Sequence, residues 1–456
     1  MKKDYRSDID GLRAIAVVSV IIYHANITLL NNQILSGGFL GVDIFFVISG
    51  YLITKIIVND LDKNNFSFKN FYERRIRRIL PALFSIFIFT FLLSWIFLLP
   101  IDFINYSKSV ISSFFFISNY YFYLSGLEYG AQVGLLKPIL HTWSLSVEEQ
   151  YYLIFPFFLF FFYKIVNKKI FLIIILLIVS SFILSHLNIH KNSELKFYSI
   201  HTRIWELLIG SLILFIEKSK KAHQFKINNS LFQYLGILLI CISFFFLNDE
   251  TKHPSYLTLI PLIGTALIII CNKNNSLIYK IISSKLFVGT GLISYSLYLW
   301  HFPLFAYARI SELSQLGNFF KIIICILILI LSVISYQFIE KPFRDKRYNF
   351  KKLSIILTFL GIVILSANWL VIKSNGFAQR YSDIYEINEI DNRLLKKKSW
   401  EIFESKRNFF DKNINNKKIL FLGDSHTKDL FNSFYLNKKF YPQYDFSTIR
   451  YLLNLN

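Results

Sequence analysis

The chain has 456 residues, of which 54% are hydrophobic, 18% are aromatic and only 17% are charged, and its formal net charge is +21. This composition is far more apolar than a water-soluble domain of this length can bury, which excludes an ordinary soluble enzyme. The lysines and arginines lie in short clusters between apolar runs and form no basic domain, so the positive charge does not indicate a nucleic-acid partner.

The apolar residues fall into runs that are long enough to cross a membrane. Runs of about 18 residues or more recur from Ile15 to Ile372, and each spans about 30 Å of hydrocarbon as a helix. Since a backbone in lipid must satisfy its own hydrogen bonds, these runs predict an all-α polytopic membrane protein. The first run has a charged flank but no small-residue cleavage site, so we expect it to be retained. The expected spans are residues 11–28, 39–58, 78–99, 149–164, 169–187, 200–217, 230–247, 256–272, 286–307, 319–339 and 353–372.

Basic residues are distributed unevenly among the loops between these spans. The loop before the second span has no Lys or Arg, whereas the loop after it contains Lys55, Lys63, Lys69, Arg74, Arg75, Arg77 and Arg78. The positive-inside rule therefore predicts a cytoplasmic N-terminus, and an odd number of crossings then predicts an extracytoplasmic C-terminus. The apolar segment from Val110 to Leu124 does not fit as a span, because counting it would invert every later loop. We expect this segment to be re-entrant or interfacial.

The first two spans each carry a titratable side chain near the predicted outer surface. The thirteen helical steps from Gly11 to His24 place that imidazole roughly 20 Å from the inner surface. The second span carries Asp43 near its outer end. A carboxylate beside an imidazole would hold one tautomer and make the imidazole a better general base. Two plainer interpretations stay open: a histidine satisfied by its neighbours, and an interfacial aspartate that faces water.

Four arginines stand at the predicted cytoplasmic start of the third span, namely Arg74, Arg75, Arg77 and Arg78. Members three positions apart share a helix face, and guanidinium groups bind phosphate oxygens through paired hydrogen bonds. A phosphate-rich cytosolic cofactor fits this pattern. Anchoring to anionic lipid headgroups explains the basic charge equally well.

Polar side chains interrupt the apolar pattern at three further places. They include His141 and Trp143, residues 201–206, and His301. Two adjacent carboxylates, Glu148 and Glu149, follow the first of these clusters. Adjacent side chains point to different helix faces, so we expect at most one of the two carboxylates to face the interior. Each cluster could line a cavity or be simple packing, and Trp143 could belong to an interfacial aromatic belt.

The sequence contains no Walker loop, no dinucleotide fingerprint and no Cys/His spacing typical of a metal site. Its three cysteines, Cys241, Cys271 and Cys325, lie in apolar runs, where thiols pack as small hydrophobic groups. We therefore expect neither a metal site nor nucleotide hydrolysis.

After Ile372 the composition becomes polar, which predicts a linker over residues 373–416. An apolar strand then leads into Gly423-Asp424-Ser425, as at the start of an α/β domain.

Five blocks, in this order, resemble the acyltransferase-3 family: residues 8–14 with His24, 41–50, 74–81, 142–150 and 294–301. The resemblance covers residues 5–343 and implies ten core helices, followed by a linking helix over residues 344–372. It implies a membrane O-acyltransferase, usually an O-acetyltransferase, in the bacterial cytoplasmic (inner) membrane. The acyl group would pass from cytosolic acetyl-CoA to a hydroxyl of lipopolysaccharide O-antigen, another surface polysaccharide or a lipid-linked glycan.

The same resemblance implies roles for individual residues. Arg13 would join the four arginines of the third span in holding the phosphates of the coenzyme. His24 would deprotonate the acceptor hydroxyl or briefly carry the acyl group, and Asp43 would orient His24. The remaining catalytic candidates are Glu148 and Glu149, and the candidates for substrate contact are Trp143, His141 and His301.

Residues 417–456 resemble the first block of an SGNH-type esterase domain, with Ser425 at the nucleophile position. No histidine follows His426, so these residues cannot supply a complete serine triad. We therefore expect an incomplete SGNH-like domain, in which Ser425 is the weakest of the catalytic candidates. Two other functions remain open, a transporter or flippase that moves an acyl donor or lipid-linked sugar unaltered, and an inactive membrane scaffold.

Overall fold

The computed structural model describes residues 5–30, 32–127, 132–166, 170–187, 193–218, 230–271, 276–313, 317–381, 392–406, 410, 416–423 and 425–450. The chain divides into two compact units, Met1–Lys373 and Ser374–Asn456. The first unit is a helical bundle and the second is a small α/β unit.

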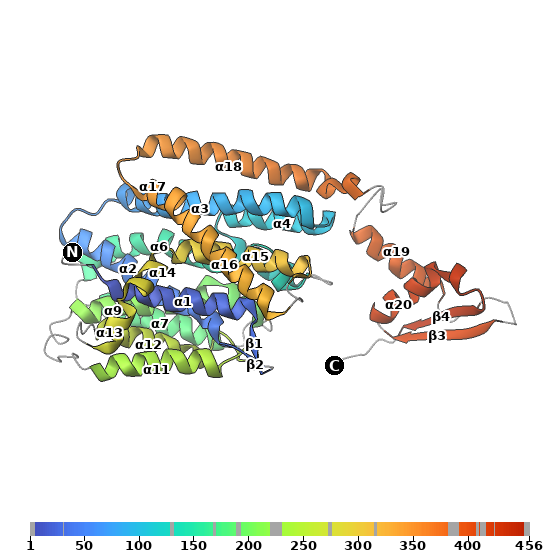
Figure 1. Ribbon diagram of the computed structural model, residues 1–456, viewed down its shortest axis with the longest axis horizontal. Coiled ribbons are helices and arrows are strands. Elements are labelled where there is room, and N and C mark those ends of the chain that lie inside the picture. Colours follow the sequence, from blue (N-terminus) through green and yellow to red (C-terminus); the bar gives the residue numbers. More distant parts are fainter. Residues whose placement is uncertain are drawn as a thin grey trace. The chain divides into compact units, whose positions relative to one another are not determined.

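The long helices of the first unit lie side by side, with their axes roughly aligned (Figure 1). In chain order the described α-helices of this unit, long and short, are α1 (Ser7–Ala25), α2 (Gly41–Asp62), α3 (Phe68–Phe97), α4 (Pro100–Phe114), α5 (Ser118–Gly126), α6 (Thr142–Val166), α7 (Ile170–His186), α8 (Ser193–Tyr198), α9 (Ile200–Lys218), α11 (Ser230–Phe246), α12 (Leu259–Ile270), α13 (Leu277–Ile282), α14 (Lys285–Leu292), α15 (Ser294–Ile310), α16 (Asn318–Ser335), α17 (Lys341–Arg344) and α18 (Phe350–Lys373). A short hairpin of β1 (Thr28–Leu29) and β2 (Asn32–Gln33) follows α1.

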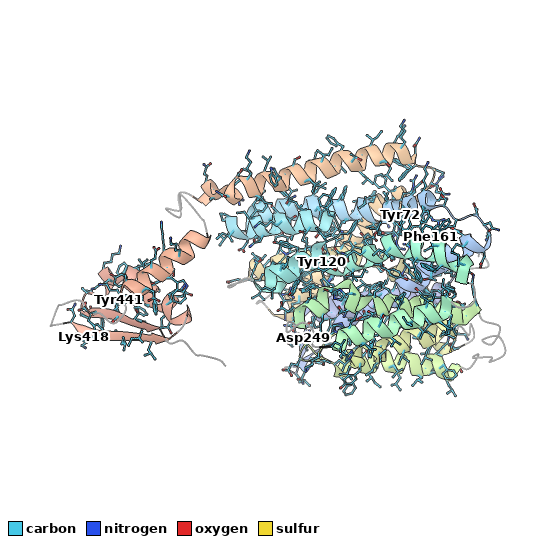
Figure 2. All side chains as sticks on the ribbon, turned by 180° about the vertical axis from the view of Figure 1, so that it is seen from behind. Tyr72, Tyr120, Phe161, Asp249, Lys418 and Tyr441 are labelled. Atoms are coloured by element: carbon cyan, nitrogen blue, oxygen red, sulfur yellow. The ribbon has the colours of Figure 1, made fainter. Side chains whose placement is uncertain are left out.

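Several of these helices have the length and composition of membrane spans. Among the described residues, five qualify on both counts: Gly38–Asp62, Phe68–Phe97, Glu194–Lys218, Asn318–Arg344 and Phe350–Lys373. Three shorter apolar helices accompany them. Large apolar side chains such as Phe161, labelled in Figure 2, are exposed on the outside of the unit. The prediction of a helical multi-pass membrane protein is confirmed, whereas the eleven crossings and their orientation stay predictions.

Two segments differ in detail from the expected helices. The segment from Val110 to Leu124 is not continuous, because α4 ends at Phe114 and α5 begins at Ser118. Between the two helices Phe116 has a positive φ of 55°, a conformation that stops a helix. The expected span 286–307 is likewise divided, into α14 and α15.

Small residues allow the central helices α2 and α9 to approach closely. A Cβ atom added at Gly50 would lie 1.8 Å from the carbonyl oxygen of Leu207, and one added at Gly210 would lie 2.0 Å from that of Val47. Neither position has room for any side chain. Close approach of this kind is how helices associate where the surrounding lipid is as apolar as the side chains.

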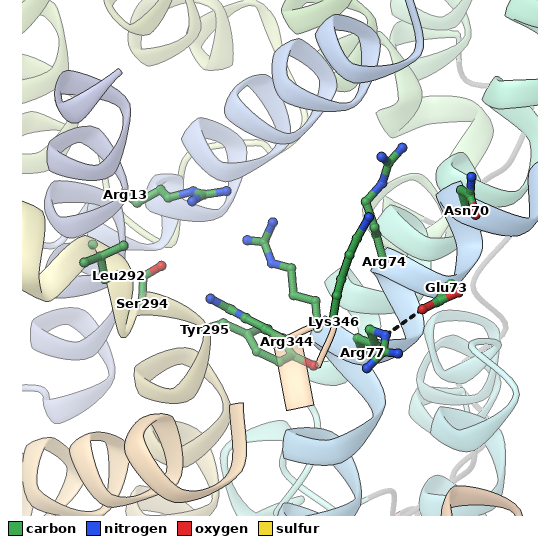
Figure 3. Close-up of a pocket in the computed structure, with 12 residues that line it drawn as sticks. Arg13, Asn70, Glu73, Arg74, Arg77, Leu292, Ser294, Tyr295, Arg344 and Lys346 are labelled. Atoms are coloured by element: carbon green, nitrogen blue, oxygen red, sulfur yellow. Dashed lines mark hydrogen bonds and ion pairs between the residues drawn. The ribbon is translucent and has the colours of Figure 1, made fainter. Parts of the chain in front are cut away.

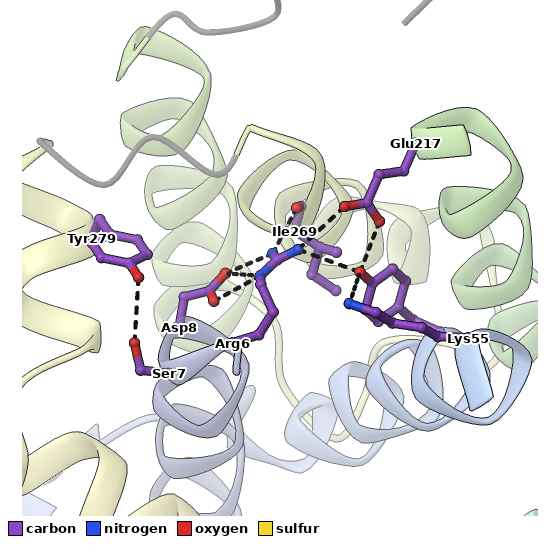
Figure 4. A network of polar contacts seen from close by, with 8 residues as sticks. Arg6, Ser7, Asp8, Lys55, Glu217, Ile269 and Tyr279 are labelled. Carbon is purple, nitrogen blue, oxygen red and sulfur yellow. Dashed lines mark hydrogen bonds and ion pairs between the residues drawn. The ribbon is translucent and has the colours of Figure 1, made fainter. Parts of the chain in front are cut away.

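A network around Arg6 joins the start of α1 to α2, α9 and α12 (Figure 4). The Nη2 atom of Arg6 lies 2.7 Å from Oδ2 of Asp8 and 2.8 Å from the carbonyl oxygen of Ile269. The hydroxyl of Tyr51 donates to Glu217 over 2.8 Å, and Arg6 is 3.6 Å from the same carboxylate. These bonds engage Arg6 within its own chain, which makes it a structural cation.

The second unit is built on a β-α-β arrangement. Strands β3 (Lys417–Gly423) and β4 (Tyr444–Arg450) pair in parallel, with α20 (Ser425–Leu436) between them in sequence. Helix α19 (Asn392–Ser405) lies within the expected polar linker, and its Phe403 packs with Phe431 and Phe446 in the core. The linker prediction therefore missed a helix, because the many lysines around Phe403 and Trp400 conceal an apolar pair three residues apart.

Candidate active site

A basic cavity of about 350 Å³ lies at the end of the bundle where α1 begins (Figure 3). Six cationic side chains line it, against the single carboxylate of Glu73: Arg13, Arg74, Arg77, Arg78, Arg344 and Lys346. They come from α1, α3, α17 and the turn after α17. An excess of guanidinium groups around one cavity is suited to a ligand with several phosphates.

The arginines of this cavity differ in how far their own chain already satisfies them. Arg77 is only 4% exposed; it pairs with Glu73 over 2.8 Å and donates to the carbonyl oxygens of Phe343, Asp345 and Tyr348. It therefore holds the turn after α17 in place.

The other members leave more bonding capacity for a ligand. Arg74 pairs with Asp60 over 3.0 Å, and Arg13 pairs with Asp10 over 3.1 Å. Arg78 makes no hydrogen bond or ion pair with any residue in the described part of the chain, although it lines the cavity. Its five N–H donors are thus the most available to a bound anion.

A narrow chamber of about 70 Å³ adjoins the basic cavity, and the two share Arg13, Arg78, Ser294 and Tyr295 as lining residues. Both Glu148 and Glu149 line the chamber, which corrects the expectation that only one would face the interior. The hydroxyls of Ser49 and Tyr152 donate to Glu148. Oε1 of Glu149 is buried and has no hydrogen-bond partner among the described residues. The expectation failed because the chamber extends around more than one face of α6.

A much larger cavity, of about 1480 Å³, is lined by five histidines, three of which, His24, His141 and His301, lie close together. The ring centroid of His301 lies 5.4 Å from that of His24 and 5.6 Å from that of His141. Nδ1 of His24, both ring nitrogens of His141 and Nε2 of His301 have no hydrogen-bond partner among the described residues. The structure thus brings together three histidines that lie far apart in sequence, with ring nitrogens free to exchange a proton.

Asp43 does not pair with His24, so this prediction is wrong. Its Oδ1 atom lies 2.9 Å from Nη2 of Arg203 and 3.3 Å from Nε2 of His253. Glu206 lies 3.3 Å from the same Arg203. A buried guanidinium is the stronger partner for a buried carboxylate, and α9 supplies it. Burial also lowers the pKa of His253, in the loop before α12, against the opposing effect of Asp43.

Trp143 belongs to the surroundings of Arg203 as well as to the large cavity. The guanidinium carbon of Arg203 lies 5.5 to 5.6 Å from the ring centroids of Trp143, Phe46 and Phe197. These cation–π contacts stabilise a charge that is completely buried.

The sequence singled out residues 201–206 but predicted no role for them. It gave no indication of His253, Arg344 and Lys346 as site residues. These three lie in a loop or at a helix end, where polar residues are common, whereas a polar residue within an apolar helix is conspicuous.

The three cavities adjoin one another through shared lining residues. The chamber shares Arg13 and Arg78 with the basic cavity, and it shares Val42 and Tyr298 with the large cavity. The hydroxyl of Tyr298 lies 2.6 Å from Oγ of Ser144 and donates to the carbonyl oxygen of His141 over 2.7 Å. A chain of lining residues therefore leads from the arginines to the three histidines.

Ser425 begins α20 in the second unit, and its side chain lies outside the described residues. Within the described part of the chain, no group of three or more His, Cys, Asp or Glu side chains is arranged to hold a metal ion.

Comparison with known proteins identifies the family. Residues 6–337 match the family model described as an acyltransferase domain. The chain belongs to the acyltransferase-3 family. It is 31% identical over 480 residues to "Putative O-acetyltransferase SAS0844" of Staphylococcus aureus (strain MSSA476), which covers 95% of this chain and 76% of that protein.

Two further relatives carry the name O-acetyltransferase OatA. The protein from Staphylococcus aureus (strain MRSA252) is 30% identical over 81% of this chain and 63% of its own length. That from strain NCTC 8325 / PS 47 is 31% identical over 76% of this chain and 58% of its own length. No solved structure matches. The predicted resemblance is confirmed, and with it the prediction of an O-acetyltransferase-type enzyme.

Proposed function

We propose that this chain transfers an acetyl group from cytosolic acetyl-CoA to a hydroxyl of a bacterial surface polysaccharide, for which lipopolysaccharide O-antigen is one candidate. The observation that carries this proposal is the succession of three adjoining cavities, from arginines at one end to histidines beyond the chamber. The basic end faces the cytoplasm if the positive-inside rule holds for the loop that contains the four arginines.

The donor proposal rests on the charges of the basic cavity. A coenzyme A molecule carries its phosphates at one end and its thioester at the other, so phosphates held by Arg13, Arg78 and their neighbours leave the thioester free to extend into the chamber. Arginine suits this task because its planar fork binds two phosphate oxygens at once. The donor requires no metal.

The acetyl transfer assigns His24 the role of general base. The acceptor oxygen attacks the carbonyl carbon of the thioester, the new C–O bond forms, and the C–S bond breaks. His24 takes the hydroxyl proton and returns a proton to the departing thiolate, so the products are the ester and the free thiol. The unpartnered Nδ1 atom of His24 supports this role, since no described side chain competes for it.

The test compares ester-linked acetate on the surface polysaccharide of cells that produce the parent chain or its His24→Ala variant. We expect a loss of about 100-fold or more, the usual contribution of a general base. His201→Ala, which replaces an exposed histidine, is the matched control. Acetate that persists in His24→Ala at equal membrane abundance would refute the assignment.

A transporter or flippase remains the second candidate, because a path lined by polar groups through a bundle also suits transport. The same measurement separates the two functions. A transporter moves its substrate unaltered, so cells that produce it gain no ester that depends on His24.

A further inference from the structure

We propose that Phe45, packed against Tyr298, restricts the transferred group to two carbons. This inference rests on the proposed function and adds to it the residue that selects acetyl over longer acyl groups. It starts from the position of the chamber, which lies between the basic cavity and the three histidines. A thioester whose phosphates stay with the arginines must place its acyl group in or beyond this chamber to meet the acceptor.

The size of the chamber sets the first limit. Its volume is about 70 Å³, whereas a protein cavity of about 150 Å³ holds one molecule of benzene, with six carbon atoms. The chamber therefore has room for about three non-hydrogen atoms by this comparison, which is the number in an acetyl group. The neighbouring cavities are several times larger, so the restriction lies at this point of the path.

The walls of the chamber are held in place by contacts of their own. The hydroxyl of Tyr298 is fixed between Ser144 and the carbonyl oxygen of His141. Elsewhere in the lining, Ser49 and Tyr152 both donate to the carboxylate of Glu148. A longer acyl chain could enter only by breaking such hydrogen bonds or by displacing packed rings, and packed interiors resist both.

Phe45 is one of the apolar side chains that line the chamber, and it is held by packing alone. Its ring lies 6.4 Å from that of Tyr298 in an edge-to-face arrangement. It is half-buried and lies one helical turn after Val42, which lines both the chamber and the large cavity. Phe45 is thus a large apolar side chain near the outer end of the chamber, and its removal enlarges the space without leaving a polar group unpartnered.

The test measures binding of three thioesters, acetyl-CoA, propionyl-CoA and butyryl-CoA, to the purified full chain in detergent. The parent chain should bind butyryl-CoA at least tenfold more weakly than acetyl-CoA, as expected for added methylenes that a tight pocket rejects. Phe45→Ala should remove most of this difference. Phe45→Leu should give an intermediate ratio, and it serves if Phe45→Ala does not fold. Phe359→Ala, at a position 65% exposed on α18, is the matched control and should keep the parent ratio.

Every outcome of this binding measurement either supports or overturns the role of Phe45. Equal affinity of the parent for all three thioesters would overturn the inference, as would a folded Phe45→Ala or Phe45→Leu chain with the parent ratio. In either case acetyl-CoA still binds, so the proposed donor stands. Failure of the parent to bind any of the three would instead reject the proposed donor and this inference together.

Discussion

At the scale of single residues, neighbouring arginines of one helix have different roles. The guanidinium of Arg77 is engaged by its own chain, in an ion pair with Glu73 and three hydrogen bonds to backbone carbonyls. Arg78 lines the same cavity with a guanidinium that makes no such bond to the described residues. The sequence shows four equivalent arginines. Which of them holds the fold and which awaits a ligand depends on the turn after α17, which lies more than 260 residues away along the chain.

This difference predicts opposite phenotypes for two similar substitutions. Arg77→Ala should destabilise the chain by roughly 3 kcal/mol or more, because it removes one partner of a buried ion pair. Arg78→Ala should keep the parent's melting temperature but weaken acetyl-CoA binding about tenfold or more, the value of a lost charge-assisted bond. Thermal unfolding and donor binding, measured on the same detergent samples, check both. If the two variants had equal stability and equal affinity for acetyl-CoA, the assignment of Arg77 to the fold and Arg78 to ligand binding would be wrong.

Asp43 provides a second prediction at this scale. Because it pairs with Arg203 and His253 instead of His24, Asp43→Asn should lower stability, by roughly 3 kcal/mol. It should leave the shape of the pH profile of acetyl transfer unchanged, because Asp43 does not touch the general base. The check is to measure acetyl transfer as a function of pH for the parent and the variant. A shift of the acidic limb of the profile in Asp43→Asn would show that Asp43 orients His24 after all.

At the scale of elements, the sequence allowed the main helices to be predicted but not their interruptions. Apolar length alone located the spans that became α2, α3, α9, α16 and α18. The break between α4 and α5 depends on the backbone conformation of Phe116, which carries no signal in composition. The candidate site followed the same division. The candidate roles of His24 and the arginines could be predicted from their residue types. The partner of Asp43 could not, because it depends on how α2 packs on α9.

That packing yields a third prediction. Gly210→Ala should sharply reduce the yield of folded protein, because its Cβ atom would lie 2.0 Å from the carbonyl oxygen of Val47 and force α2 away from α9. Gly289→Ala is the control, since a Cβ atom there meets nothing within 4 Å. Size-exclusion chromatography of detergent-extracted membranes measures the yield. If both variants behave like the parent, the close contact is not required.

At the scale of the whole molecule, the proposed function depends on which side of the membrane each cavity faces. In a chain whose native cysteines are replaced by alanine, Lys346→Cys tests the basic end and Glu250→Cys tests the end with the three histidines. A membrane-impermeant thiol reagent added to intact cells should label Glu250→Cys and spare Lys346→Cys. The reverse pattern would place the arginines outside and remove cytosolic acetyl-CoA as donor.

Following the acetyl group itself distinguishes transfer from transport. Sealed membrane vesicles that contain the full chain receive acetyl-CoA, labelled in its acetyl group, on the cytoplasmic side only. The proposed transfer predicts labelled ester on polysaccharide at the opposite side, and its loss in His24→Ala at equal abundance. Label that crosses without entering an ester, or ester formation that persists in His24→Ala, would contradict it.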